Sequence, residues 1–133
     1  MPRPIALSLN ETWDYVLKDN REDQEEEQTV FHLRALSLKQ RTKLQNMVSA
    51  SSGDDEDTTV MQIAIGDRSL YSCEHGIAGW DNFIDGEGNE VEFRSVGASA
   101  SRKSLEVIGS SDMAELSNEI VERSSLTKDQ VGK

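Results

Sequence analysis

The segment 79–93 limits the possible folds most, because aromatic residues lie on both sides of a run of turn-forming residues. Trp80 and Phe83 precede the glycine-, aspartate- and asparagine-rich stretch 85–89, and Phe93 follows it in an alternating apolar pattern. Apolar residues on either side of such a turn are typical of a β-hairpin with a bulged or longer loop. We therefore expect two antiparallel strands here, joined by a loop whose glycines adopt positive φ angles.

A second pair of strands is predicted near the start of the chain. In residues 11–18, Trp13 and Tyr15 alternate with polar residues, and residues 29–36 alternate in the same way around Phe31. A period of two over eight residues indicates a strand with one face buried. We expect the two strands to pair antiparallel across the acidic segment 19–28, which should be a solvated loop.

Two helices are predicted in the middle of the chain. Ser37 and Gln40 have the spacing of a capping box, in which each side chain accepts a hydrogen bond from a free backbone N–H of the other residue. Apolar residues from 60 to 78 recur at the spacing of one helical face, and Gly76 and Gly79 would end that helix. The first helix therefore begins near residue 37, and the second runs from about residue 58 to the segment 76–79.

The end of the chain has a weaker pattern. Residues 94–104 are rich in serine, alanine and glycine, which predicts a flexible loop. Ser110 or Ser111 should cap a final helix, which buries a stripe that includes Leu116 and Ile120. The order of elements predicts an α+β fold of two antiparallel β-hairpins packed with about three helices. We expect the chain to consist of an extended arm (1–10), a single α+β domain (11–126) and a flexible tail (127–133).

Composition excludes several classes of function. The chain of 133 residues carries a formal charge of −11, and its lysines and arginines form no cluster that could follow a phosphate backbone. We therefore expect no nucleic-acid partner. No apolar run approaches the roughly 20 residues of a membrane span, so we expect no membrane association. The single cysteine, Cys73, lies among apolar residues and is expected to be a core residue in a reducing compartment.

Reactive residues are few, and we expect no enzyme, no metal and no cofactor. A calcium loop could use Asp81, Asp85 and Glu92, but an apolar residue falls at a required ligand position, so turn formation is the simpler interpretation. The histidines, His32 and His75, do not have the spacing of zinc ligands. Cys73 and His75 are two residues apart, which would place them on different sides of a helix and prevent a nucleophile–base pair.

The pattern resembles that of small structural and tail-assembly proteins of tailed bacteriophages. The similarity lies in residues 10–17 and 27–37, in the Trp–turn–Asp–Gly–strand segment 79–93, and in a closing helix with the Glu115–Leu116 step. The closest similarity is to tail assembly chaperones, which hold the tape-measure protein in solution while tail-tube subunits assemble around it. The alternative is a virion structural component, such as a head–tail connector, neck, decoration or baseplate protein.

The resemblance implies a non-catalytic role with other phage proteins as partners: the tape-measure protein, tail proteins or head–tail proteins. The protein would act in the host cytoplasm during assembly or in the virion, and assembly with further copies of the chain is compatible with either place. Aromatic residues dominate the anchors of protein interfaces, although aromatics beside a turn are more often core residues. The candidate partner-binding residues are Trp13, Tyr15, Phe31, Trp80, Phe83 and Phe93.

Overall fold

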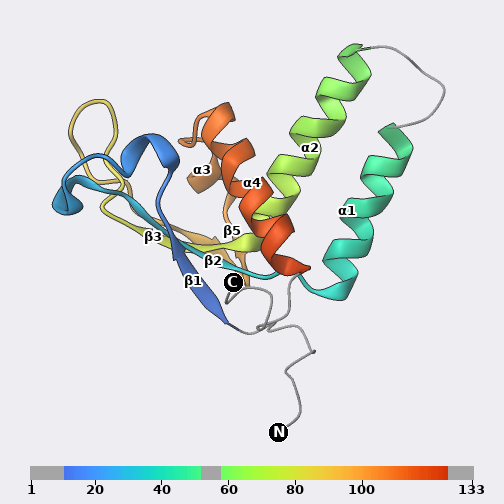
Figure 1. Cartoon of the computed structure of the whole chain (residues 1–133), viewed down its shortest axis with the longest axis horizontal. Helices are drawn as coiled ribbons and strands as arrows, with labels where there is room; N and C mark the ends of the chain where they lie inside the picture. Colours follow the sequence, from blue (N-terminus) through green and yellow to red (C-terminus); the bar gives the residue numbers. More distant parts are fainter. Residues whose placement is uncertain (1–10, 52–57, 126–133) are drawn as a thin grey trace, which may run out of the picture.

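The chain folds as an α+β domain, and the computed structural model describes residues 11–51 and 58–125. Four α-helices accompany a three-stranded and a two-stranded antiparallel sheet in these residues (Figure 1). The elements in chain order are β1 (Thr12–Tyr15), two 3-10 turns η1 (Lys18–Asn20) and η2 (Glu25–Glu27), β2 (Val30–Arg34), α1 (Leu38–Ser51), α2 (Thr58–Gly76), β3 (Ile77–Asp81), β4 (Ser95–Val96), β5 (Ser99–Ala100), α3 (Arg102–Leu105) and α4 (Ser110–Ser124).

The first hairpin is confirmed. β1 pairs antiparallel with β2, with Trp13 opposite Leu33 and Tyr15 opposite Phe31. Alternation places these four side chains on one face of the sheet, where Leu33 and Phe31 are buried in the core. The prediction succeeds because the period-two pattern fixes both the strands and the face that must be buried.

The prediction of a second hairpin at 79–93 is confirmed only for its turn, because residues 83–85 pair with 89–91 while the first predicted strand has another partner. β3 pairs with β2 instead, with Phe31 opposite Trp80, which gives the sheet order β1-β2-β3. The segment after β3 returns through the bridge between Ile84 and Glu90 and through two backbone hydrogen bonds, from the Val91 N–H to the Phe83 carbonyl and from the Asp85 N–H to the Asn89 carbonyl. An aromatic cross-strand pair in the core stabilises β3 on β2 more than a short, exposed return strand could.

A small hairpin occurs where the flexible loop 94–104 was predicted. β4 and β5 pair antiparallel around Gly97, whose φ of 62° lies in the left-handed region that glycine adopts without strain. The segment is tied to α3, because Ser104 Oγ accepts a hydrogen bond from the Arg94 N–H and donates one to the Arg94 carbonyl. The Ser104 side chain therefore orders the segment through hydrogen bonds to the Arg94 backbone.

The predicted helices are present. The Ser37–Gln40 capping box forms, with distances of 2.9 and 3.2 Å between each side-chain oxygen and the other residue's backbone nitrogen. α2 runs without a break to Gly76, and the chain enters β3 at the next residue. α4 begins at Ser110 with Gly109 at the N-cap position, and its predicted stripe packs into the core.

α2 and α4 pack on the three-stranded sheet, and α1 packs on α2. α2 is central, because it contacts α1 on one side and α4 on the other (Figure 1). The core gathers apolar side chains from β2, β3 and the helices. Its fully buried members of largest volume include Phe31, Leu33, Leu36, Ile77, Leu105, Leu116 and Ile120. The predicted arm (1–10) and tail (127–133) lie outside the described residues.

Candidate functional site

Four of the six candidate residues form one cluster, which we call the aromatic corner: Phe31, Trp80, Phe83 and Phe93. The rings of Phe83 and Phe93 each lie 4.9 Å from the Trp80 ring, centroid to centroid, at nearly perpendicular angles. Phe31 completes the cluster at 6.0 Å from Trp80 and 5.5 Å from Phe83. Edge-to-face contacts of this kind are favourable beyond the area they bury.

The aromatic corner has a buried side and an exposed side. Phe31 and Trp80 are 1% and 7% exposed, and the Trp80 indole N–H donates to the Val91 carbonyl at 2.9 Å. Both therefore serve the core, as aromatics beside a turn usually do. Phe83 and Phe93 are only partly buried, and the neighbouring Ile84 is 45% exposed. This side of the corner is the part that a partner could reach.

The loop beyond Phe83 is built by turn chemistry. Asp85 Oδ1 accepts hydrogen bonds from the backbone N–H groups of Glu87 and Asn89, both at 2.9 Å. Gly88 has a φ of 84°. These contacts are those of turn formation, with Asp85 directed at its own loop. In residues 11–51 and 58–125, no group of three or more His, Cys, Asp or Glu side chains is placed to hold a metal ion.

The acidic segment 19–28 lies beside the aromatic corner. The Asn82 side chain donates to the carbonyls of Glu26 and Gln28, at 2.9 and 3.1 Å, and Thr29 Oγ1 donates to the Asn82 carbonyl. Asn82 holds a φ of 57°, a conformation that asparagine tolerates better than most residues. The prediction of an exposed loop holds for Asp19 and for 21–27, whereas Asn20 and Gln28 are half-buried, and two 3-10 turns give the segment regular structure.

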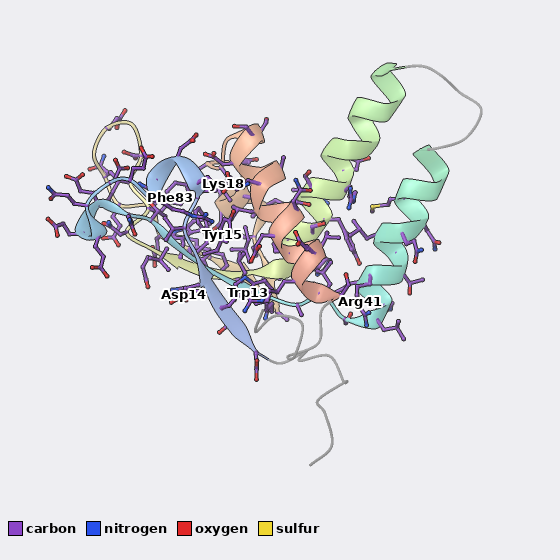
Figure 2. All side chains as sticks on the ribbon, in the orientation of Figure 1. Trp13, Asp14, Tyr15, Lys18, Arg41 and Phe83 are labelled. Carbon is purple, nitrogen blue, oxygen red and sulfur yellow. The ribbon has the colours of Figure 1, made fainter. Side chains whose placement is uncertain are left out.

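This contact brings two strongly acidic segments together, at one end of the molecule (Figure 1). Segments 19–28 and 81–92 hold eleven acids and one base, a formal charge of −10 out of the −11 of the whole chain. We call these two segments, with the exposed side of the aromatic corner, the acidic end. Figure 2 shows Phe83 among the side chains at this end. A negative field here favours basic partners.

Trp13 and Tyr15 have a different role, because they attach β1 to α4. The Trp13 indole N–H donates to Glu119 Oε2 at 3.0 Å, and the Tyr15 hydroxyl donates to Glu115 Oε2 at 2.7 Å. The guanidinium of Arg123 lies 4.8 Å from the centre of the Trp13 ring. Burial, followed by the hydrogen bond to Glu115, raises the pKa of Tyr15 to about 12. Both polar groups are thus satisfied within the chain.

Sequence reasoning missed Glu115 and Glu119 as partners of β1. They are four residues apart, so they lie on one face of α4 and can meet alternate residues of a strand that crosses it. The signal in the sequence was the spacing of these two acids on a predicted helix, together with a predicted strand that carries Trp13 and Tyr15.

The open face of the sheet carries a polar row of three residues. His32 Nδ1 lies 2.8 Å from an Asp14 oxygen, and His32 Nε2 lies 2.8 Å from an Asp81 oxygen. The hydrogen bond to Asp14 is the largest of the effects that raise the pKa of His32. His32 lies on the face of β2 opposite the buried residues Phe31 and Leu33. The row links all three strands across the face opposite the helices.

Cys73 and His75 face different surroundings. Cys73 is fully buried, with Sγ 3.5 Å from the Met113 carbonyl, and burial raises its pKa to about 12. A thiol in this environment is not ionised near neutral pH. His75 lies against the Tyr71 ring and 3.1 Å from Ser99 Oγ, and burial lowers its pKa. The prediction that Cys73 is a core residue is confirmed.

Comparisons add no further identification of the site. Protein-family models, curated protein sequences and solved structures were searched with this chain, and none matches. Among the helices that the structure describes, none combines the length and the apolar character needed to cross a bilayer.

Proposed function

We propose that this protein is a non-catalytic bacteriophage assembly protein that binds other tail or virion proteins, as a tail assembly chaperone for the tape-measure protein. It would hold apolar segments of the tape-measure protein in solution until tail-tube subunits surround them. The proposal rests on the sequence resemblance for its biology and on the acidic end for its physical mechanism.

The observation that carries the proposal is the exposed apolar patch at the acidic end. Ile84 is 45% exposed, Phe83 and Phe93 are half-buried, and all three lie in or next to the acid-rich segment 81–92, which Asn82 connects to the acidic segment 19–28. An apolar centre with a polar rim is the usual construction of a protein interface. The chemistry fits an amphipathic helix whose apolar stripe is bordered by lysine and arginine.

The charge of this end also supplies solubility. A complex between an apolar tape-measure segment and a neutral chaperone would aggregate, whereas a chain with a net charge of −11 repels other copies of the same complex. Binding and solubility are therefore expected to depend on neighbouring but separate residues.

Co-expression tests the proposal. A tape-measure protein that is co-expressed with this chain should be soluble with the wild type and largely insoluble with Ile84→Ser. Val107→Ser is the matched control, because Val107 is 48% exposed and Ile84 is 45% exposed, and Val107 lies outside the acidic end. Equal solubility with both variants and with no chaperone at all would contradict the proposal.

Charge variants test whether the acidic end contributes to binding. Glu87→Lys with Glu90→Lys should weaken binding of a basic amphipathic helix and reduce its dependence on salt. Glu122→Lys, an exposed position on α4, should leave binding unchanged.

Mass spectrometry of purified particles distinguishes the chaperone from a virion component. A chaperone is absent from finished particles, whereas a connector, neck, decoration or baseplate protein is present at a fixed copy number. Presence at fixed copy number would replace the chaperone role with the structural one.

A further inference from the structure

A pocket of about 350 Å³ lies where α1, α2 and the end of α4 meet. Leu36, Leu44 and Val121 form its apolar wall, and Arg41 from α1 and Arg68 from α2 also line it. Figure 2 shows Arg41 beside the start of α1, far along the molecule from Phe83 and the acidic end. This pocket is therefore separate from the surface discussed above.

Two arginines line this pocket, and each has a buried Nε atom without a hydrogen-bond partner among the described residues. The Nε atoms of Arg41 and Arg68 are buried and have no hydrogen-bond acceptor, and neither guanidinium forms an ion pair with a side chain that the structure describes. Other partly buried arginines are satisfied: Arg34 Nε donates to the His75 carbonyl, and Arg123 pairs with Glu119. The contrast is notable in a chain with 25 acids and only 14 lysines and arginines.

A buried guanidinium N–H without an acceptor is costly. Two such groups from different helices, beside one apolar wall, are therefore poor elements of stability. No side chain in the part of the chain that the structure describes supplies an acceptor, and a bound oxyanion would supply one. Guanidinium groups match carboxylate and phosphate oxygens in geometry and charge.

We propose that this pocket binds a small amphipathic oxyanion, with a carboxylate or phosphate held by Arg41 and Arg68 and a short alkyl chain against Leu36, Leu44 and Val121. The volume lies at the lower end of the range for small-ligand pockets, roughly 300–1,000 Å³, so the alkyl chain is short. The site is independent of the proposed assembly role, because it uses none of the residues of the acidic end.

Calorimetric titration of the whole chain with four probes tests the charge and the apolar part separately. Hexanoate and hexyl phosphate should bind, and the tighter of the two identifies the preferred oxyanion. Inorganic phosphate should bind more weakly than hexyl phosphate, because it leaves the apolar wall uncovered. Hexylammonium, with the same alkyl chain and the opposite charge, should not bind.

Matched variants locate the site. Arg41→Met and Arg68→Met should each reduce the affinity for the better probe by about tenfold or more, the loss expected for a charged hydrogen bond. Arg94→Met is the control, because Arg94 is exposed outside this pocket and pairs only weakly with Glu92 at 3.6 Å. Equal loss in all three variants, or binding of hexylammonium as strong as that of hexanoate, would overturn the proposal.

A spectroscopic measurement on the wild type avoids any effect of the variants on folding. The Nε–Hε resonances of Arg41 and Arg68 should shift on addition of hexanoate, while that of Arg94 should stay in place. Unchanged resonances for both pocket arginines at millimolar hexanoate and hexyl phosphate would refute the site.

Discussion

Replacing Gly76 by alanine tests the closest approach between α2 and α4. A Cβ atom at this position would lie 2.5 Å from Ile120 Cγ2 and 2.6 Å from Ile120 Cδ1. Ile120 is fully buried, so its side chain has no free space into which it can move. Overpacking of this kind costs about 1–3 kcal/mol, and the better helix propensity of alanine returns up to about 1 kcal/mol. We expect Gly76→Ala to lower the free energy of unfolding by about 1–2 kcal/mol.

Urea unfolding followed by far-ultraviolet circular dichroism measures this change, and an unchanged m-value keeps the comparison valid. Gly66→Ala is the control in the same helix, because a Cβ there meets no atom of the described residues within 4 Å. This variant should stabilise the protein by about 0.5–1 kcal/mol. If Gly76→Ala were as stable as Gly66→Ala, the packing of α2 on α4 described here would be wrong.

A double variant shows whether Ile120 is the cause. Ile120→Ala alone should cost about 2–5 kcal/mol through the cavity that it leaves. In the Gly76→Ala, Ile120→Ala double variant the new methyl group occupies part of that cavity. The total loss should therefore be smaller than the sum of the two single losses by about 1 kcal/mol or more.

Three further predictions concern single side chains. The raised pKa of His32 means that the protonated imidazole stabilises the fold. The stability advantage of the wild type over His32→Asn should therefore be full below pH 6 and should decline as the pH rises above 6.5 through the folded-state pKa. Urea midpoints at pH 5.5 and 8.5 measure this advantage, and a constant difference would argue against the two aspartate contacts. Tyr15→Phe removes a hydrogen bond to the Glu115 carboxylate and should cost about 1–2 kcal/mol in urea unfolding, whereas no loss would show that this contact does not hold β1 on α4. Cys73 should react with iodoacetamide only after addition of denaturant, because its thiol is buried and its pKa is raised to about 12. Mass spectrometry measures the alkylation, and rapid alkylation of the folded chain would contradict the place of Cys73 in the core.

Local patterns predicted the elements whose formation depends on nearby residues. The β1–β2 hairpin follows from alternation around Trp13, Tyr15 and Phe31, because a one-residue shift would expose all three. The start of α1 follows from the Ser37–Gln40 pair, since a capping box needs only residues three apart.

Contacts between distant residues decided what the sequence could not predict. The segment 79–93 reads as a hairpin by itself, but Trp80 has a better partner in Phe31, 49 positions earlier in the chain. β4 and β5 have only two residues each, which is too short for a periodic signal.

The candidate site was predicted in part. The six aromatic residues do cluster, but in two groups with different surroundings, and Phe31 and Trp80 are buried in the core. Asn82 connects the acidic segment 19–28 to the aromatic corner. This connection depends on hydrogen bonds from its side chain to backbone carbonyls 54 and 56 residues earlier in the chain. The pairing of Arg41 with Arg68 in one pocket likewise has no signature in the sequence.

Hydrogen exchange of the complex with the tape-measure protein tests the central claim most directly. The account predicts that backbone amides in 81–93, together with those in 19–28, exchange more slowly in the complex than in the free chain. Amides of α1, which lies away from the acidic end, should exchange at unchanged rates (Figure 1). Protection confined to α1 and α2, or no protection at the acidic end, would contradict the claim that this end binds the partner.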